Sequence, residues 1–211
     1  MSSQAGMITI IDYGTGNLRS IHNMLRHLDV DSEITSDPAR VAQAGKLILP
    51  GVGKFDYGMR ELEARGLAAA MTRRVTEDGA PILGICLGAQ LLTHASEEGE
   101  LPGLGWVAAR TVRFDGATVR SANVRVPHMG WADTEFLGEH PLASGLASPR
   151  FYYVHSYHLE ADAPENVLCR AVHGRPFTAG IAHGHILGVQ FHPEKSHHFG
   201  MTVLKNFAER Y

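Results

Sequence analysis

The stretch that most constrains this chain spans residues 81–92 and reads PILGICLGAQLL. It predicts a short apolar strand ending at Cys86, a sharp turn, and a helix that begins near Leu87. Gly84 and Gly88 flank the cysteine at positions minus two and plus two, where small residues permit the tight turn of a nucleophile elbow. Such a turn presents the Cys86 thiol, and the N-terminus of the following helix favours its thiolate form.

Apolar strands alternate with helical patterns over roughly the first 95 residues, which indicates an α/β fold with a mostly parallel sheet flanked by helices. The predicted strands of this half are 7–11, 30–35, 46–49 and 81–86, and helices are predicted after the turn at 14–17, from Asp37-Pro38, and at 57–65 and 67–77. Beyond Glu98, strands are predicted at 103–114, 119–126, 151–159, 167–172, 178–182 and 186–191, before a last helix at 201–211. We interpret residues 1–211 as a single domain with an antiparallel extension and a flexible leader at 1–6.

Composition narrows the class of partner. Nineteen Lys and Arg stand against 22 Asp and Glu, a net charge of −3, so no surface for nucleic acid or an anionic membrane is expected. No apolar run approaches the roughly 18 residues of a membrane span. Two cysteines far apart, without a secretory signal, favour a reducing cytoplasm over a disulfide framework. The expected partner is a small molecule or a protein.

A catalytic thiolate needs a base, and the base needs a group that orients it. Among 13 histidines, spacing selects His192, because His192-Pro193-Glu194 follows a predicted buried strand. Residues two apart in extended chain point to the same side, so one imidazole nitrogen can face the sulfur while Glu194 holds the other. Alone, this motif is more often an exposed strand end. Paired with the elbow, it indicates a Cys-His-Glu triad.

Acyl chemistry also needs hydrogen-bond donors for the oxyanion that forms on attack. The amide of Leu87, next after the nucleophile, is the expected first donor. Val52 is the expected second donor, because Gly51 and Gly53 on either side let its peptide plane turn the N–H inward. Taken alone, this loop is a weak signal.

Other motifs favour structural interpretations. Cys169 lies in a predicted strand without an elbow and is expected to be a core residue. The turn Gly14-Thr15-Gly16 lacks the third glycine of a dinucleotide fingerprint, since Arg19 stands in that place, so no cofactor is predicted. No metal is predicted either, because four histidines lack convincing ligand spacing: His183, His185, His197 and His198.

Taken together, the motifs carry a family resemblance over most of the chain. The segments GICLGAQ (84–90), PGVG (50–53), HSY (155–157) and QFHPE (190–194) resemble those of class I, triad-type glutamine amidotransferases. The segments IDYGTGNL (11–18) and VPHMGW (126–131) are similar to those of the glutaminase subunits of imidazole glycerol phosphate synthase. In that family the glutaminase passes ammonia to a β/α-barrel cyclase subunit, which makes imidazole glycerol phosphate and AICAR in histidine biosynthesis.

The resemblance implies hydrolysis of L-glutamine to glutamate and ammonia through a glutamyl thioester, without a cofactor. The implied catalytic residues are Cys86, His192 and Glu194. The implied glutamine-binding residues are Gly53, Gln90, Glu98, Ser156 and Tyr157, with Glu98 as partner of the α-ammonium. The implied cyclase-facing residues are Asn17, Met129, Trp131, Tyr152 and Lys195. Such glutaminases are expected to have little activity until the cyclase and its nucleotide substrate bind, and the Val52 peptide is a plausible switch.

Some positions depart from the pattern of the histidine-pathway glutaminase. Arg125 stands where lysine is usual, Ala132 where asparagine is usual, and Ala89 where methionine is common. Because changes near Trp131 fall on the implied partner face, the identity of the partner stays open. The alternatives are a paralogous glutaminase that feeds a sugar-amidating enzyme of surface-polysaccharide biosynthesis, and a free-standing cysteine hydrolase of γ-glutamyl substrates. A non-catalytic binding subunit is disfavoured by the complete triad.

Overall fold

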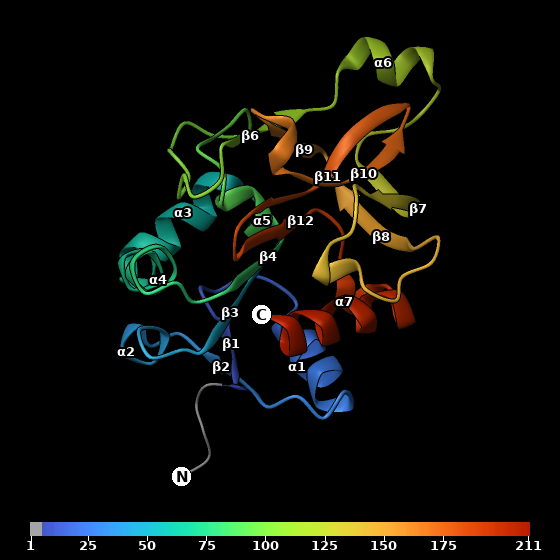
Figure 1. The fold of residues 1–211 in the computed structure, drawn as a ribbon. Helices are drawn as coiled ribbons and strands as arrows, with labels where there is room; N and C mark the ends of the chain where they lie inside the picture. The colour runs from blue at the N-terminus through green and yellow to red at the C-terminus, as the bar shows by residue number, and fades with distance from the viewer. Residues whose placement is uncertain (1–5) are drawn as a thin grey trace.

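The structure is a computed structural model that describes residues 6–211, apart from the side chain of Thr118. Most of the predicted leader, residues 1–5, lies outside the described residues. Within the described part, twelve strands join in one sheet, whose main path runs β2-β1-β3-β4-β12-β11-β10-β7-β8 (Figure 1). The strands are β1 (Ile8–Ile11), β2 (Ser32–Thr35), β3 (Lys46–Gly51), β4 (Ile82–Cys86), β5 (Ala95–Ser96), β6 (Ala109–Arg113), β7 (His128–Phe136), β8 (Arg150–His155), β9 (Tyr157–Ala161), β10 (Val167–His173), β11 (Arg175–His183) and β12 (Ile186–Val189).

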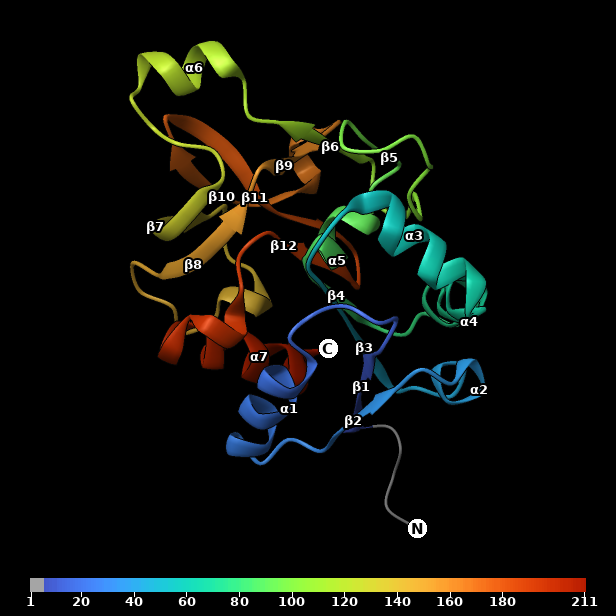
Figure 2. The ribbon, with the colours of Figure 1, turned by 180° about the vertical axis from the view of Figure 1, so that it is seen from behind.

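Helices cover both faces of the parallel strands. Seen from both sides, α1 and α7 lie against one face, and α3 and α4 lie on the other (Figures 1 and 2). The helices are α1 (Leu18–His27), α2 (Pro38–Val41), α3 (Phe55–Ala64), α4 (Leu67–Thr72), α5 (Leu87–Leu91), α6 (Gly116–Ser121) and α7 (His197–Arg210). None of the helices in the described residues is long and apolar enough to cross a membrane.

The central strands are parallel, and the helices that connect them bury them on both faces. Strands β2, β1, β3, β4 and β12 pair in parallel, and every residue of β1, β3, β4 and β12 is buried. Continuous apolar runs are the sequence pattern of such strands. Two apolar clusters result, one on each side of the sheet, with Ile10 and Phe207 in the first and Leu49 and Phe55 in the second.

The second half of the sheet is antiparallel and curls back toward the first. Strands β12, β11, β10, β7 and β8 pair antiparallel in that order. Exposed and less exposed residues alternate along much of β7, as expected when one face of a strand meets solvent. The curl brings β8 beside the segment after β12, where the His192 N–H donates to the Tyr152 carbonyl at 2.9 Å. The predicted α/β fold with a mostly parallel sheet and an antiparallel extension is confirmed.

Several local predictions after Glu98 were wrong. The predicted strand at 119–126 instead begins within α6, which lies away from the sheet where no strand can pair with it (Figure 1). Only the end of the predicted strand at 103–114 forms β6. Its first part packs on the end of α5 instead, with the Leu104 N–H donating to the Leu91 carbonyl at 2.8 Å. The polar backbone groups of both segments therefore find partners outside the sheet.

Other elements also differ from the prediction. The predicted strand at 151–159 is two strands that part at Ser156, because β8 pairs with β7 whereas β9 pairs with β6 and β11. Strand β7 itself was not predicted. The last helix begins at His197 rather than at 201. The predicted short helix at Asp37-Pro38 is confirmed, with the Asp37 side chain accepting from the Ala39 N–H at 2.9 Å.

Candidate active site

The predicted elbow is present at the junction of β4 and α5. Cys86 has φ 55° and ψ −110°, a left-handed conformation that a residue with a side chain rarely adopts. A Cβ added to Gly88 would lie 1.7 Å from the Leu49 carbonyl oxygen, and one added to Gly84 would lie 2.8 Å from the backbone of Ala89. The two glycines therefore allow the turn that presents Cys86, as the sequence predicted.

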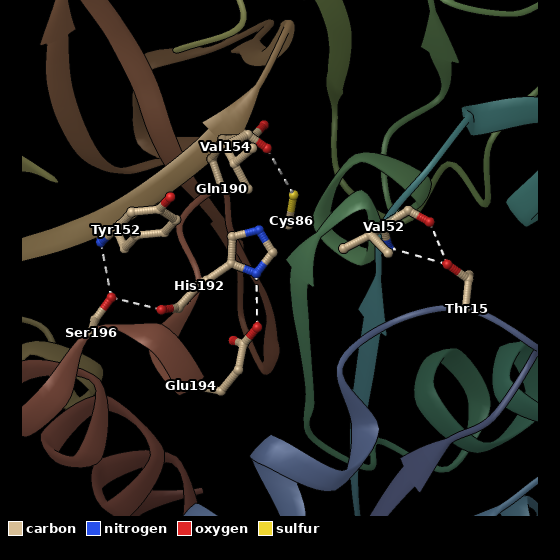
Figure 3. Close-up of polar contacts among 9 residues, drawn as sticks. All are labelled: Thr15, Val52, Cys86, Tyr152, Val154, Gln190, His192, Glu194 and Ser196. Carbon is tan, nitrogen blue, oxygen red and sulfur yellow. Dashed lines mark hydrogen bonds and ion pairs between the residues drawn. The ribbon is translucent and has the colours of Figure 1, made fainter. Parts of the chain in front are cut away.

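His192 lies between Cys86 and Glu194 (Figure 3). Its Nδ1 is 2.9 Å from the Glu194 Oε1, and both side chains are about 1% exposed. An ionised carboxylate only accepts hydrogen bonds, so Nδ1 carries the proton and Nε2 is left to face the sulfur. No residue of the described chain hydrogen-bonds to that Nε2. The three predicted triad residues thus come together from two strand ends.

The backbone around His192 is fixed on both sides. Its N–H donates to the Tyr152 carbonyl, and its carbonyl accepts from the Ser196 hydroxyl at 2.6 Å. The same Ser196 oxygen accepts from the Tyr152 N–H at 2.9 Å, which closes a small ring of hydrogen bonds (Figure 3). This ring holds the imidazole against β8 without using either ring nitrogen.

The protonated form of His192 is stabilised by its neighbours. Burial acts to lower the pKa of His192, but the nearby Cys86 sulfur and the hydrogen-bonded Glu194 carboxylate outweigh burial and raise the pKa to about 9. The site therefore stabilises the imidazolium that forms when His192 takes the thiol proton. A base whose charged form is stabilised in this way is suited to passing that proton to a leaving group.

Two further groups contact the Cys86 sulfur. The Gln190 Nε2 donates to Sγ at 3.7 Å. The thiol donates to the Val154 carbonyl oxygen at 3.9 Å (Figure 3). Gln190 was not among the predicted site residues. The available signal was its position two residues before His192, because residues two apart in extended chain point to the same side.

Val52 lies beside the elbow with its amide turned away from the sulfur. Its N–H donates to the Thr15 hydroxyl at 3.4 Å, and that hydroxyl donates to the Val52 carbonyl (Figure 3). Thr15 belongs to the glycine turn after β1, and Gly53 next to Val52 has φ 113°, a conformation that glycine adopts readily. The two predicted oxyanion donors therefore differ, since the Leu87 amide begins α5 directly after Cys86 whereas the Val52 amide is engaged elsewhere.

A cavity of about 400 Å³ opens onto Cys86. Its lining includes most of the residues predicted for oxyanion and glutamine binding, together with Cys86 and three others. The lining residues are Val52, Gly53, Cys86, Leu87, Gln90, Glu98, Pro127, Val154, His155, Ser156 and Tyr157. A larger open groove, of about 1390 Å³, lies beside β7 and β10 and contains none of the predicted site residues. Its position away from Cys86 gives it no part in the predicted chemistry.

Two polar side chains of the cavity are held in fixed orientations. The Gln90 Nε2 donates to the Tyr157 carbonyl and to the Gln190 Oε1, each at 3.1 Å. The Glu98 carboxylate accepts from the Phe55 N–H at 2.9 Å, at the N-terminus of α3. One carboxylate and one amide therefore face the same small space as the sulfur.

Two hydrogen-bonded, buried histidines, one of which lines the cavity, were not among the predicted site residues. The His155 Nδ1 donates to the Tyr157 carbonyl at 2.7 Å, so its Nε2 accepts from the His128 Nδ1 at 3.1 Å. Burial lowers the pKa of His128 to about 4 and lowers that of His155 as well. Both rings are neutral at pH 7, and their hydrogen bonds leave His192 as the better-placed base for Cys86.

The predicted partner-facing residues form one surface next to the site, with Asn17 at its edge. Met129 is 64% exposed and Trp131 is 40% exposed on β7. The Trp131 ring packs at 75° to that of Tyr152, with centroids 6.2 Å apart, and the Lys195 Nζ lies 5.9 Å from the centre of the Tyr152 ring. Asn17 is exposed at the start of α1, which contacts the segment Pro193–Lys195. Exposed apolar side chains of this kind mark interaction surfaces.

His197 extends this surface in a way that the sequence did not indicate. Its ring stacks on Trp131, with centroids 5.4 Å apart and planes 3° from parallel.

Among the described residues, no group of three or more potential metal ligands occurs. Cys169 is fully buried in the core, where burial raises the pKa of its thiol.

Comparison with known proteins assigns the family. The model of the family "Glutamine amidotransferase class-I" matches residues 9–210. The chain therefore belongs to the class I glutamine amidotransferases, and the resemblance seen in its motifs is confirmed.

Individual relatives share more specific names than the family as a whole. Imidazole glycerol phosphate synthase subunit HisH 2 of Methanococcus maripaludis is 45% identical and covers 97% of this chain and 100% of its own length. The subunit of the same name from Pseudomonas aeruginosa is also 45% identical, over 96% of this chain and 99% of its own. Subunit HisH of Bdellovibrio bacteriovorus is 42% identical over 96% of this chain and 100% of its own.

Solved structures agree on the fold. A crystal structure of a glutamine amidotransferase matches with a TM-score of 0.73 at 22% identity, over 95% of this chain and 97% of that one. The structure of PurLQS from Thermotoga maritima matches with a TM-score of 0.65 at 18% identity, over 97% of this chain and 98% of that one. At these identities the likeness concerns the fold alone.

Proposed function

We propose that this chain is the glutaminase subunit of an imidazole glycerol phosphate synthase, which hydrolyses L-glutamine and passes the ammonia to a cyclase subunit. The observation that carries the proposal is the cavity beside Cys86, because it joins a presented thiol to a carboxylate and an amide suited to a free amino acid. The names of relatives that match over nearly the whole chain support the choice of synthase.

The proposed reaction begins when Cys86 gives its proton to the His192 Nε2 and its sulfur attacks the carboxamide carbon of glutamine. The Leu87 amide donates to the oxyanion that forms. His192 then protonates the departing nitrogen, which leaves as ammonia, and a glutamyl thioester remains on Cys86. Water that loses a proton to His192 hydrolyses the thioester, which releases glutamate and restores the thiol. Glu194 keeps the proton on Nδ1 throughout, so Nε2 is always the nitrogen that exchanges it.

The cavity provides groups for both ends of glutamine. Glu98 is the proposed partner of the α-ammonium, since its carboxylate lies in the lining and is held by the Phe55 amide. The Gln90 Nε2 already donates to two protein oxygens. The Gln90 Oε1 is therefore the atom of this side chain that is proposed to bind the substrate. Ser156 and Tyr157 complete the opposite wall from the junction of β8 and β9.

The Val52 peptide is the proposed switch. Its N–H now reaches the Thr15 hydroxyl, so the second oxyanion donor is not directed at the cavity. Turning that peptide inward would add a donor of about 3 kcal/mol of transition-state stabilisation. Thr15 stands two residues before Asn17, which belongs to the proposed partner surface. A partner that contacts Asn17 therefore acts on the same turn that holds Val52.

The proposed partner surface consists of Asn17, Met129, Trp131, Tyr152 and Lys195. Its exposed apolar and aromatic side chains are the residue types enriched at the centres of protein interfaces. The Tyr152 carbonyl holds the backbone of His192, so strand β8 both carries part of the surface and hydrogen-bonds to the segment of the catalytic base. The proposed occupant is the β/α-barrel cyclase, with which the chain forms a heterodimer.

The test is glutamate release by the purified chain alone, with the cyclase, and with the cyclase plus its nucleotide substrate. The proposal expects little hydrolysis alone and strong stimulation in the last condition. A Cys86→Ala variant should lose all stimulated activity. Strong activity without the cyclase would instead support a free-standing hydrolase. Stimulation by a sugar-amidating enzyme, but not by the cyclase, would support the paralogous glutaminase.

A further inference from the structure

We propose that Gln190 is a positioning residue that holds and stabilises the Cys86 thiolate through a relay from the wall of the glutamine cavity. The inference rests on the proposed role of Cys86 as nucleophile. Gln190 is fully buried directly after β12, and its Nε2 lies 3.7 Å from the Cys86 sulfur. Gln190 points to the same side of the chain as His192, which lies two residues further on. The side chains of both residues therefore approach the sulfur from the segment that follows β12.

The orientation of the Gln190 amide follows from a chain of hydrogen bonds. The chain begins at the Tyr157 carbonyl, which can only accept, so the Gln90 group that faces it at 3.1 Å must be the NH₂. That same NH₂ lies 3.1 Å from the next amide, so the Gln190 atom that meets it must be the acceptor, Oε1. The remaining end of Gln190, its NH₂, therefore faces Cys86. A backbone carbonyl thus determines which atom of Gln190 meets the sulfur.

A donor in this position acts on the charged form of the nucleophile. The thiol proton has the Val154 carbonyl as a partner at 3.9 Å, and when that proton leaves to His192 the sulfur becomes a charged hydrogen-bond acceptor at the wall of the cavity. The Gln190 N–H then donates to a charged atom, and such bonds are stronger than those between neutral groups. Gln190 therefore favours the thiolate and limits the directions in which the sulfur can swing.

The relay also links the sulfur to the cavity wall. Tyr157 lines the cavity, and its carbonyl accepts from Gln90 and from the His155 ring. A ligand that moves this wall acts on Gln90, then on the direction of the Gln190 donor. A buried glutamine that merely satisfied its own polar atoms would have no effect on the ionisation of Cys86, and this separates the two roles.

The test measures how fast iodoacetamide alkylates Cys86 in the purified full chain between about pH 6 and pH 10, read by peptide mass spectrometry, because only the thiolate reacts. Gln190→Met keeps the shape of the side chain but removes the donor. The expected result is about tenfold slower alkylation near pH 7, with rates that converge at the alkaline end. Gln190→Glu, which places an oxygen at the sulfur, should slow the reaction near pH 7 at least as much.

Two controls accompany these variants. Gln43→Leu changes an exposed glutamine and should leave the profile unchanged, and the fully buried Cys169 should stay unlabelled while the protein is folded. Wild-type rates near pH 7 in both Gln190 variants would overturn the inference. A rate reduced equally at every pH would do the same, since it would indicate altered access. Alkylation of Cys86 does not depend on glutamine hydrolysis. A wild-type chain that fails to hydrolyse glutamine under any condition would therefore refute the proposed function, and the alkylation rates would still test the role of Gln190.

Discussion

The hydroxyl of Thr15 is the best single point at which to test the proposed switch. It accepts from the Val52 N–H at 3.4 Å and donates to the Val52 carbonyl, so it holds both polar groups of that residue. Thr15→Val removes both hydrogen bonds and keeps the branched shape. A neutral hydrogen bond contributes about 0.5–1.5 kcal/mol net, and the first of these is long, so the pair stabilises this peptide orientation by about 1–2 kcal/mol.

Loss of that stabilisation should raise the unstimulated glutaminase kcat of the isolated chain by about 5- to 30-fold, because more molecules then turn the Val52 amide toward the oxyanion. The assay is glutamate release at saturating glutamine without the cyclase. Thr15→Ser keeps the hydroxyl and should behave like the wild type. Equal unstimulated rates for Thr15→Val and wild type would refute the argument that Thr15 restrains the amide, and a lower rate would show that the observed orientation is the productive one.

Three other perturbations test the site and its frame. Glu194→Gln should lower the free energy of unfolding most at about pH 6, by about 1–2 kcal/mol, and progressively less toward pH 9. The raised pKa of His192 stabilises the fold below pH 6.5, and this contribution is lost as the pH passes about 9. A difference in unfolding free energy between variant and wild type that does not change with pH in urea titrations would contradict this prediction. Tyr13→Phe should raise the free energy of unfolding by about 1 kcal/mol, since the fully buried Tyr13 hydroxyl has no hydrogen-bond partner within residues 6–211. A thermal midpoint below that of the wild type would contradict the view that this hydroxyl is unpaired. Gly88→Ala should destabilise the protein by about 3 kcal/mol or more, because its Cβ would meet the Leu49 carbonyl; a denaturant midpoint equal to that of the wild type would contradict the close approach.

The parallel half of the fold could be predicted because burial on both faces leaves a visible pattern. Strands β1, β3 and β4 are fully buried, and each appears in the sequence as an apolar run followed by glycine or an elbow. The extension gave weaker signals. Strand β7 alternates between exposed and less exposed residues and carries partner-type side chains, and α6 contains valine and threonine that favour strands only when a neighbouring strand is present.

The site also has a part that the sequence could predict and a part that it could not. Cys86, His192 and Glu194 could be predicted because each stands at a fixed short spacing from a turn or from another triad residue. Contacts between distant segments could not be predicted in this way. The hydrogen bonds between Thr15 and Val52 span 37 positions, and the stacking of Trp131 on His197 depends on how β7 meets the start of α7. Such contacts depend on the packing of the extension against the parallel sheet, which no local pattern records.

The proposed switch has to break only a few contacts, which bears on how large a control motion must be. The Val52 N–H meets Thr15 at 3.4 Å, and the Cys86 thiol meets the Val154 carbonyl at 3.9 Å, both long for their kinds. Releasing them costs about 1–2 kcal/mol, whereas one aligned oxyanion donor contributes about 3 kcal/mol to the transition state. Reorienting one peptide and one S–H bond is therefore sufficient for a large change in rate. A partner needs to supply only a small part of a typical interface energy, so the strand ends that hold Cys86 and His192 can stay fixed while the enzyme is switched.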